Sequence, residues 1–357
     1  MSVASFAKDR LLCLDVESVT DPELLSAEEQ DEKFPAAQRH QVMAISFLEA
    51  RIDHGPGGER YIVEQCRSGG DASDGEERLL KGFWKFFGAG VPRLVTWNGK
   101  GFVMPVLRQR AMVYGIPAAP WFQAGDKWNN YGQRYSPDWH CDLMEVLSDY
   151  GASTRVGLQD MAEAIGLPGK IEGQGSDVAD MVMRGDIAAV RRYGETDVLN
   201  IFGLYVRWAL LSGRTDPEGH NASIESLVTY LERGRADRPY LGAFLDHWRV
   251  STRPAPMFVP VPKRLPSAEE LPASRTAQVP DQLALPMEPG SRSPDDTGLR
   301  AAARDLARQS SDTEAEPEED RSLPLSERED EATPSPDEVR QEAGTGSDSE
   351  KIRRRRR

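Results

Sequence analysis

Aromatic residues are confined almost entirely to the first 250 positions of this 357-residue chain. Of the 27 Phe, Trp and Tyr residues, only Phe258 follows position 250, and the same C-terminal stretch holds 14 of the 25 prolines. A segment with so few aromatic side chains cannot bury enough apolar surface to offset the conformational entropy that it loses on folding. We therefore predict one folded domain over residues 1–250. Residues 251–357 are predicted to form a disordered, acidic and proline-rich tail with a basic end.

The charge balance limits the classes of function that this chain can serve. A net charge of −14 argues against a protein that coats duplex DNA by bulk electrostatic attraction. It is compatible with an enzyme that handles a few nucleotides in a metal-containing pocket, because the metal supplies positive charge. No apolar run approaches the ~18 residues of a membrane span, and the N-terminus lacks a hydrophobic signal segment. We expect a cytoplasmic protein without a membrane partner.

Hydrophobic periodicity predicts strands early in the chain and helices later. The predicted strands are 11–14, 42–48, 61–63 and 94–97, with a hairpin turn at 54–58 between the second and third. The predicted helices are 74–87, 102–114, 142–150, 157–165, 177–183, 186–211, 222–233 and 238–248, and Asp186 is a candidate N-cap. This order indicates an α/β fold with a mixed β-sheet flanked by helices. Cys13, Cys66 and Cys141 lack C-x-x-C spacing, so we expect buried, reduced thiols.

Asp15-Val16-Glu17 directly follows the first predicted strand. Alternate residues of a strand point to the same side, so both carboxylates face one side near the C-terminal end of the strand. Ligands of open α/β sheets gather at that end, and hard oxygen ligands suit Mg²⁺ or Mn²⁺. Taken alone, the triplet is a weak signal, because most D-x-E triplets lie on a solvated surface.

A second acidic segment, Tyr193 to Asp197 (YGETD), falls within a predicted helix. Tyr193 and Asp197 are four residues apart and therefore share one helix face. Asp197 could complete a metal site begun on the strand, and the Tyr193 hydroxyl could hold a water molecule for attack. By itself the segment is also compatible with an ordinary amphipathic helix.

The third element is segment 97–107, in which a predicted strand ends at an Asn98-Gly99 turn and leads into a helix. Position 103 falls in the first turn of this helix, where the positive end of the helix dipole favours a carboxylate. The residue at that position is Val103.

Together, in this order and at these separations, the three elements resemble the exonuclease motifs of the DEDD superfamily, whose fold is ribonuclease-H-like. The resemblance is to a bacterial group of predicted exonucleases related to the proofreading domain of family B DNA polymerases. The Y-x-x-x-D form of the last motif marks the tyrosine subtype (DEDDy), because the histidine subtype needs histidine at position 192, which is Arg192. The resemblance covers most of residues 10–211, including the segments 108–116, 140–144 and 166–170.

The resemblance implies a 3′–5′ exonuclease that acts on single-stranded ends, DNA more than RNA, by a two-metal mechanism. Asp15, Glu17 and Asp197 would bind the metal ion that activates a water molecule, and Asp15 would also contact the second metal ion. Tyr193 would orient the attacking water. The implied cofactors are two Mg²⁺ or Mn²⁺ ions.

The resemblance also implies substrate contacts at Asn98 and Phe102, and an aspartate where this chain has Val103. Three carboxylates then face the four positive charges of two divalent ions, which weakens the second metal site. Asp126 and Asp142, which follow later in the chain, do not occupy this helix turn. Losing ~4 kcal/mol of metal stabilisation would cost about a thousandfold in rate. One alternative is therefore a weak or inactive nucleic-acid-binding relative that recruits partners through its tail. Another is a general interaction scaffold, in which the acidic residues are fortuitous.

Two features of the tail suggest partners. Residues 282–287 (QLALPM) resemble the Q-L-x-L-P-L form of the peptide that binds the bacterial sliding clamp. The clamp-binding residues would be Gln282, Leu283, Leu285 and Met287, although such a hexapeptide also arises by chance. The terminal arginines, 353–357, could bind phosphates by counterion release or pair with the acidic block 312–320.

Overall fold

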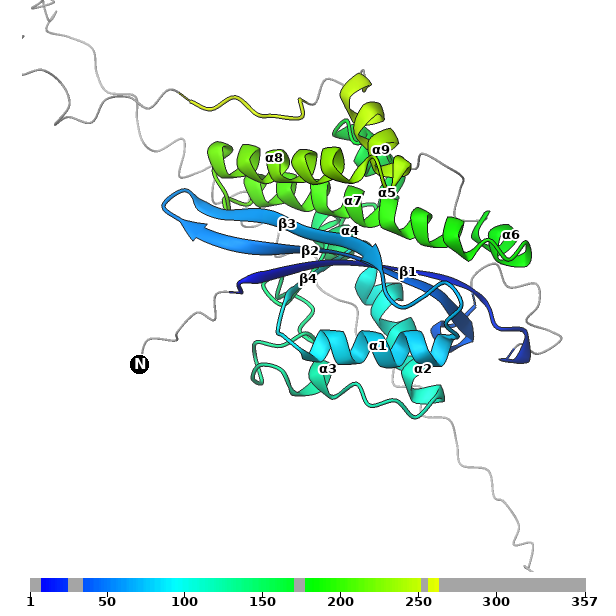
Figure 1. The fold of residues 1–357 in the computed structure, drawn as a ribbon. Coiled ribbons are helices and arrows are strands. Elements are labelled where there is room, and N and C mark those ends of the chain that lie inside the picture. Colours follow the sequence, from blue (N-terminus) through cyan, green and yellow to red (C-terminus); the bar gives the residue numbers. More distant parts are fainter. Residues whose placement is uncertain (1–7, 25–34, 170–176, 252–255, 263–357) are drawn as a thin grey trace, which may run out of the picture. The chain divides into compact units, whose positions relative to one another are not determined.

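The computed structural model describes residues 8–24, 35–169, 177–251 and 256–262 (Figure 1). All of them belong to the first of the two units into which the chain divides, Met1–Leu271. The predicted disorder of the tail therefore falls almost wholly outside the described residues. The same holds for all four residues of the predicted clamp-binding peptide: Gln282, Leu283, Leu285 and Met287.

A five-stranded mixed sheet forms the centre of the described part. Its order is β3-β2-β1-β4-β5, and β2 runs antiparallel to both of its neighbours while β1, β4 and β5 run parallel. This order and polarity are those of the ribonuclease-H-like α/β fold, which confirms the predicted fold class. The strand bounds are β1 (Arg10–Thr20), β2 (His40–Gly55), β3 (Gly58–Ser68), β4 (Arg93–Thr96) and β5 (His140–Asp142).

Helices cover both faces of the sheet (Figure 1). One face carries α1 (Glu76–Gly88), α2 (Met104–Val113) and the short α3 (Ala119–Gln123). The opposite face carries the long α7 (Ile187–Leu211) and α8 (Pro217–Gly234). The remaining α-helices are α4 (Leu143–Leu147), α5 (Leu158–Ala164), α6 (Asp177–Met183) and α9 (Pro239–Val250).

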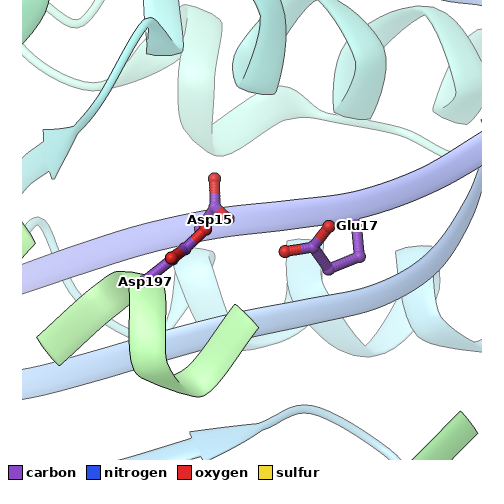
Figure 2. A group of neighbouring side chains, drawn as sticks. All are labelled: Asp15, Glu17 and Asp197. Atoms are coloured by element: carbon purple, nitrogen blue, oxygen red, sulfur yellow. The ribbon is translucent and has the colours of Figure 1, made fainter. Parts of the chain in front are cut away.

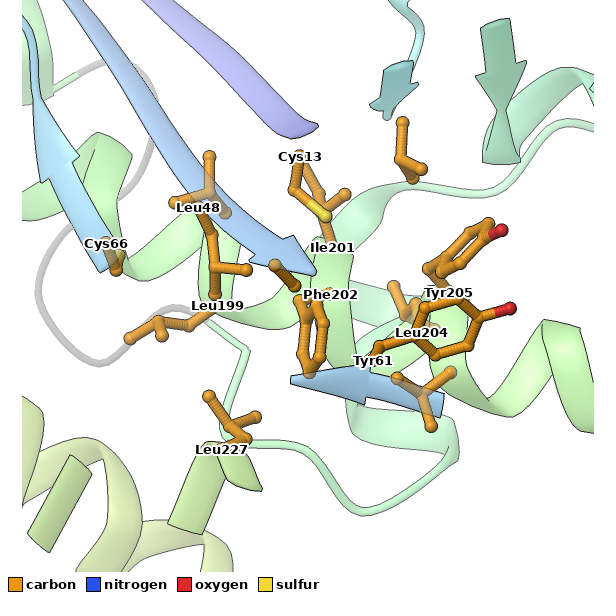
Figure 3. Packing of buried hydrophobic residues seen from close by; sticks show 14 of the residues in the cluster. Cys13, Leu48, Tyr61, Cys66, Leu199, Ile201, Phe202, Leu204, Tyr205 and Leu227 are labelled. Atoms are coloured by element: carbon orange, nitrogen blue, oxygen red, sulfur yellow. The ribbon is translucent and has the colours of Figure 1, made fainter. Parts of the chain in front are cut away.

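Two apolar clusters hold these layers together, one on each face of the sheet. Between the sheet and α7, Figure 3 shows Cys13 and Leu48 of the strands against Phe202, with Leu227 of α8 beyond them. On the other face, Leu12, Leu14 and Val16 of β1 belong to a cluster with residues of α1 and α2. The two clusters take alternate residues of β1, as a strand buried on both faces requires.

The predicted elements are largely confirmed, with differences in length and one missed strand. Each predicted strand is present, but β1 and β2 extend well beyond 11–14 and 42–48. The predicted helix 142–150 is wrong at its start, because β5 ends at Asp142 and α4 spans only Leu143–Leu147. Asp186 caps α7 as predicted, accepting a hydrogen bond of 2.9 Å from the Ala189 amide.

Two further expectations concern cysteines and membranes. Cys13, Cys66 and Cys141 are free and buried, which confirms the prediction of buried thiols. Within the described ranges, no helix is both long enough and apolar enough to span a membrane.

Candidate metal centre

Three carboxylates from distant parts of the chain meet at one place beside β1 (Figure 2). Asp15 and Glu17 lie two residues apart on the strand, and Asp197 lies on α7. Ligand oxygens of the three residues all lie within 4.8 Å of one another. Asp15 is partly exposed, whereas Glu17 and Asp197 are only 8% and 6% exposed. The structure therefore brings together the three residues that the sequence predicted as metal ligands.

The local geometry of the sheet leaves β1 accessible at this point. β4 pairs only with Leu11–Cys13 of β1, so the strand from Leu14 onward has no β4 partner. On the other side, the register between β1 and β2 shifts between Glu17 and Ser18, which marks a β-bulge. Bulges re-aim side chains and are common beside active sites. Both irregularities occur within a few residues of the carboxylates.

Gly194 allows α7 to approach the sheet closely enough for the carboxylates to meet. A Cβ atom at this position would lie 2.6 Å from Ser46 Oγ and 3.3 Å from Glu17 Cγ. Gly194 and Asp197 are three residues apart and share a helix face, so the close approach also carries Asp197 toward β1. A glycine inside a helix destabilises it by about 1 kcal/mol relative to alanine, but here the lack of a Cβ atom leaves room for the contact.

The chemistry of the three side chains fits a divalent metal ion. Carboxylate oxygens are the ligands that Mg²⁺ and Mn²⁺ prefer. Three carboxylates held so close together, two of them buried, repel one another when ionised, and a cation between them relieves that repulsion. The residues present therefore suit one divalent ion, bound by Asp15, Glu17 and Asp197.

Tyr193 lies one helical turn before Asp197 on α7 and is 7% exposed. It packs in a small cluster with Ala44, Val178 and Val190. Ala44 is the residue of β2 that pairs with Glu17. The tyrosine ring is thus held on the same side of the sheet as the carboxylates and next to the strand position opposite one of them.

Asn98 and Phe102 lie in the connection between β4 and α2, next to β1. Asn98 adopts a left-handed conformation with φ 55°, and its carbonyl accepts a hydrogen bond of 2.8 Å from the Phe102 amide. The half-buried Phe102 ring lies edge-on to His40, with ring centroids 4.9 Å apart. Since His40 pairs with Thr20, Phe102 lies near the C-terminal end of β1. Contact of either residue with a substrate stays a prediction.

Val103 ends a short π-helical segment, Gly99–Val103, and lies directly before α2 rather than within its first turn. Its side chain is 1% exposed and belongs to the apolar cluster that contains Leu14 and Val16. These two residues alternate along β1 with the carboxylates, which point to the other face. Among the described residues, the metal-binding group has only its three carboxylate members.

Two acids that follow Val103 in the chain accept hydrogen bonds from backbone amides instead. Buried Asp142 accepts a hydrogen bond of 2.8 Å from the Lys100 amide and so anchors the segment before α2; burial raises the pKa of its carboxyl. Exposed Asp126 accepts hydrogen bonds from the amides of Trp128 and Asn129. Neither acid belongs to the carboxylate group.

Glu195 lies in the same motif as Asp197, but it faces β3. Its carboxylate accepts hydrogen bonds from the amide and the hydroxyl of Ser68, at 2.8 and 2.9 Å, and a further one from Tyr240. Sequence reasoning assigned no role to Glu195 or Gly194. The sequence offered one signal, a glycine inside a run with helical periodicity, where glycine weakens the helix. The burial of Glu195 becomes visible only in the structure.

The comparisons with known proteins agree with this geometry. A family model described as a predicted 3′-5′ exonuclease related to the exonuclease domain of PolB matches residues 32–248, which is more than half of the chain. No curated protein matches the chain. The matched residues contain Tyr193 and Asp197, whereas Asp15 and Glu17 precede the matched range. The structure brings these two residues of β1 next to Asp197 of the matched part. The chain belongs to the family of predicted 3′–5′ exonucleases related to the exonuclease domain of PolB.

Proposed function

We propose that this protein hydrolyses phosphodiester bonds at single-stranded 3′ ends, DNA in preference to RNA, with Mg²⁺ or Mn²⁺ as cofactor. The observation that carries the proposal is the convergence of Asp15, Glu17 and Asp197 in a member of an exonuclease family. The relation of that family to the exonuclease domain of PolB supports DNA as the substrate.

The proposed roles of the side chains follow from their chemistry. Asp15, Glu17 and Asp197 would hold the divalent ion, which when bound would lower the pKa of water and offset the negative charge of the phosphate. Tyr193, on the same face of α7 as Asp197, orients the attacking water through its hydroxyl. The tyrosine at this position corresponds to the DEDDy subtype.

Val103 lowers the rate that we expect for this reaction. A second divalent ion would bring the total positive charge to four, against three carboxylates, so it is weakly held until a substrate phosphate arrives. A loss of ~4 kcal/mol in transition-state stabilisation corresponds to about a thousandfold in rate. The apolar burial of Val103 therefore favours one alternative function, a weak or inactive relative that binds nucleic acid and recruits partners through its tail.

The dependence of cleavage on a free 3′ end tests the proposal. Four labelled single strands are incubated with the protein and Mn²⁺: linear DNA with a 3′ hydroxyl, the same DNA with a blocked 3′ end, circular DNA, and RNA of the same sequence. We expect stepwise shortening of the first, resistance of the blocked and circular DNA, and slower loss of the RNA. Cleavage of the circle would instead indicate an endonuclease, and binding of all four without cleavage would favour the inactive relative.

A further inference from the structure

A cavity lies on the α2 side of the sheet, lined by none of the three carboxylates. It measures about 350 Å³, which is within the size range of small-molecule sites. Three cationic side chains line it, Lys100, Arg108 and Arg134, together with His140. Glu145 is the one carboxylate in its lining, and Arg134 and Arg155 already pair with it.

Lys100 and Arg108 lack a carboxylate partner within the described part of the chain. The Lys100 ammonium donates to the backbone carbonyl of Arg134. The Arg108 Nε donates to the Met104 carbonyl at 3.1 Å, and its guanidinium lies over the Trp121 ring, 5.2 Å from the centroid. Burial lowers the pKa of both side chains. For Lys100 this holds despite the attraction of Asp142 and Glu145, and for Arg108 burial is the cause. Half-buried cations whose charge is not fully compensated are costly, so this cavity favours an anion.

His140 supplies an independent indication of a ligand. Its ring is 1% exposed, and Nε2 lies 2.8 Å from the Thr96 hydroxyl. Nδ1 is buried and has no hydrogen-bond partner among residues that the structure describes. Burial lowers the pKa of His140 well below its ordinary value, so the ring is neutral and carries one proton. When the Thr96 hydroxyl donates to Nε2, that proton is on Nδ1, which is then a buried donor without a described partner in a residue that lines the cavity.

We propose that this cavity binds a phosphate group of a single-stranded nucleic acid, held by the charges of Lys100 and Arg108 and by a hydrogen bond from His140 Nδ1. Exposed aromatic side chains favour a strand over a free anion. Phe122 and Tyr135, the sequence neighbours of the lining residues Trp121 and Arg134, are 69% and 68% exposed. Bases of single strands stack on such rings. The inference rests on the proposed function, because it treats the anion as part of the substrate.

Equilibrium binding without metal tests this site separately from catalysis. Binding of a fluorescein-labelled oligothymidylate is measured by anisotropy in EDTA over a range of salt concentrations, for the wild type and for Lys100→Gln/Arg108→Gln. We expect at least about tenfold weaker binding by the double variant, because two charge-assisted contacts are lost. The slope of log affinity against log salt should fall by about 1.4, since each phosphate contact of a single strand contributes about 0.7.

The matched control removes two cations on the opposite side of the sheet. Arg235→Gln/Arg249→Gln changes the net charge by the same amount as the cavity variant. Arg235 lies at the C-terminal end of α8 and Arg249 on α9, and both pair with Glu232. We expect its affinity to stay within about twofold of the wild type and its salt slope to be unchanged. If the double variant in the cavity instead binds like this control, the proposal is overturned.

Single variants and competitors complete the test. Arg108→Lys keeps the charge and should keep the salt slope, whereas Arg108→Gln should lose about 0.7; equal slopes would contradict a phosphate contact. Lys100→Gln alone serves if the double variant does not fold, because the hydrogen bond of its ammonium goes to a backbone carbonyl. Competition by inorganic phosphate or thymidine monophosphate would show that the phosphate suffices, and competition by unlabelled oligonucleotide alone would show that the strand is needed.

Failure of this inference is distinguishable from failure of the proposed nuclease function. Asp15→Asn should remove cleavage without weakening binding in EDTA. A wild type that cleaves, with a cavity variant that binds normally, would overturn the cavity alone. A wild type that never cleaves, with a cavity variant that binds weakly, would overturn the nuclease alone.

Discussion

Replacing Asp15 with asparagine is expected to reduce the affinity of the protein for Mn²⁺ by about 100-fold or more. Loss of groups that merely support metal ligands costs 10- to 100-fold, and Asp15 is one of only three proposed ligands. At a Mn²⁺ concentration 100 times the dissociation constant, bound metal stabilises the wild type by about 2.7 kcal/mol. At the same concentration, the variant should gain only about 0.4 kcal/mol. The measurement is the melting temperature with and without Mn²⁺.

Glu195→Gln is the matched control for this prediction. Glu195 lies two residues from Asp197, but its carboxylate hydrogen-bonds to Ser68 and Tyr240 rather than joining the metal group. Its replacement should lower the melting temperature without metal and leave the rise in Mn²⁺ intact. A rise in the Asp15→Asn variant as large as that of the wild type would show that the ion binds elsewhere.

Replacing Val103 with aspartate is expected to raise the rate of 3′ shortening by up to about a thousandfold, most visibly in Mg²⁺. The segment Gly99–Val103 contacts β1, and β1 beyond Cys13 has no β4 partner. Because the Val103 side chain packs on the face opposite the carboxylates, we expect the new carboxylate to turn past this open edge toward the metal centre. Without metal, the same carboxylate is an uncompensated buried charge. We therefore expect Val103→Asp to lose about 3 to 5 kcal/mol of folding free energy in EDTA and to regain much of it in Mn²⁺.

Val103→Asn separates the new ligand from the disturbance of the core. Asparagine has nearly the shape of aspartate but no charge, so it should destabilise the protein without a gain in rate and without metal-dependent recovery. Single-turnover rates and melting temperatures of both variants are compared in Mg²⁺, Mn²⁺ and EDTA. If Val103→Asp shows no dependence on metal beyond that of the wild type, position 103 does not reach the site.

Much of the fold could be predicted from the sequence, because its elements carry strong local signals. The long apolar periodicity of α7, the apolar run in β1 and the glycine-rich turn between β2 and β3 each predict the element that is observed. β5 was missed because three residues are too short to show a period, and because its sequence leads directly into the turns of α4. The extended ends of β1 and β2 are largely polar and depend on their pairing with neighbouring strands, including β3.

The candidate site could be predicted in part. The spacing of Asp15 and Glu17 on a strand, and that of Tyr193 and Asp197 on a helix, follow from local geometry. Spacing alone does not show that the two elements meet; the family resemblance implied it, and the structure brings the two elements together. The role of Gly194 could not be predicted, because it depends on the distance between a helix and a sheet that are far apart in sequence.

The cavity beside α2 could not have been predicted at all. Its charged residues come from the segment before α2, from α2 itself and from the connection that leads to β5. Nothing in the sequence around Arg108 or His140 indicates that their side chains face a common space. Among the described residues, no carboxylate forms an ion pair with Lys100 or Arg108, and this is why they indicate an anionic ligand. Which side chains pair depends on the fold and not on the local sequence.

The most direct test of the metal-dependent nuclease is a single-turnover time course on 5′-labelled single-stranded DNA in Mn²⁺, with the wild type and Asp15→Asn side by side. We predict that the wild type shortens the strand one nucleotide at a time from its 3′ end and is inactive in EDTA. Asp15→Asn should be slower by about a thousandfold or more, corresponding to ~4 kcal/mol of lost metal stabilisation. Equal shortening by both proteins, or shortening that persists in EDTA, would contradict a nuclease built on Asp15, Glu17 and Asp197.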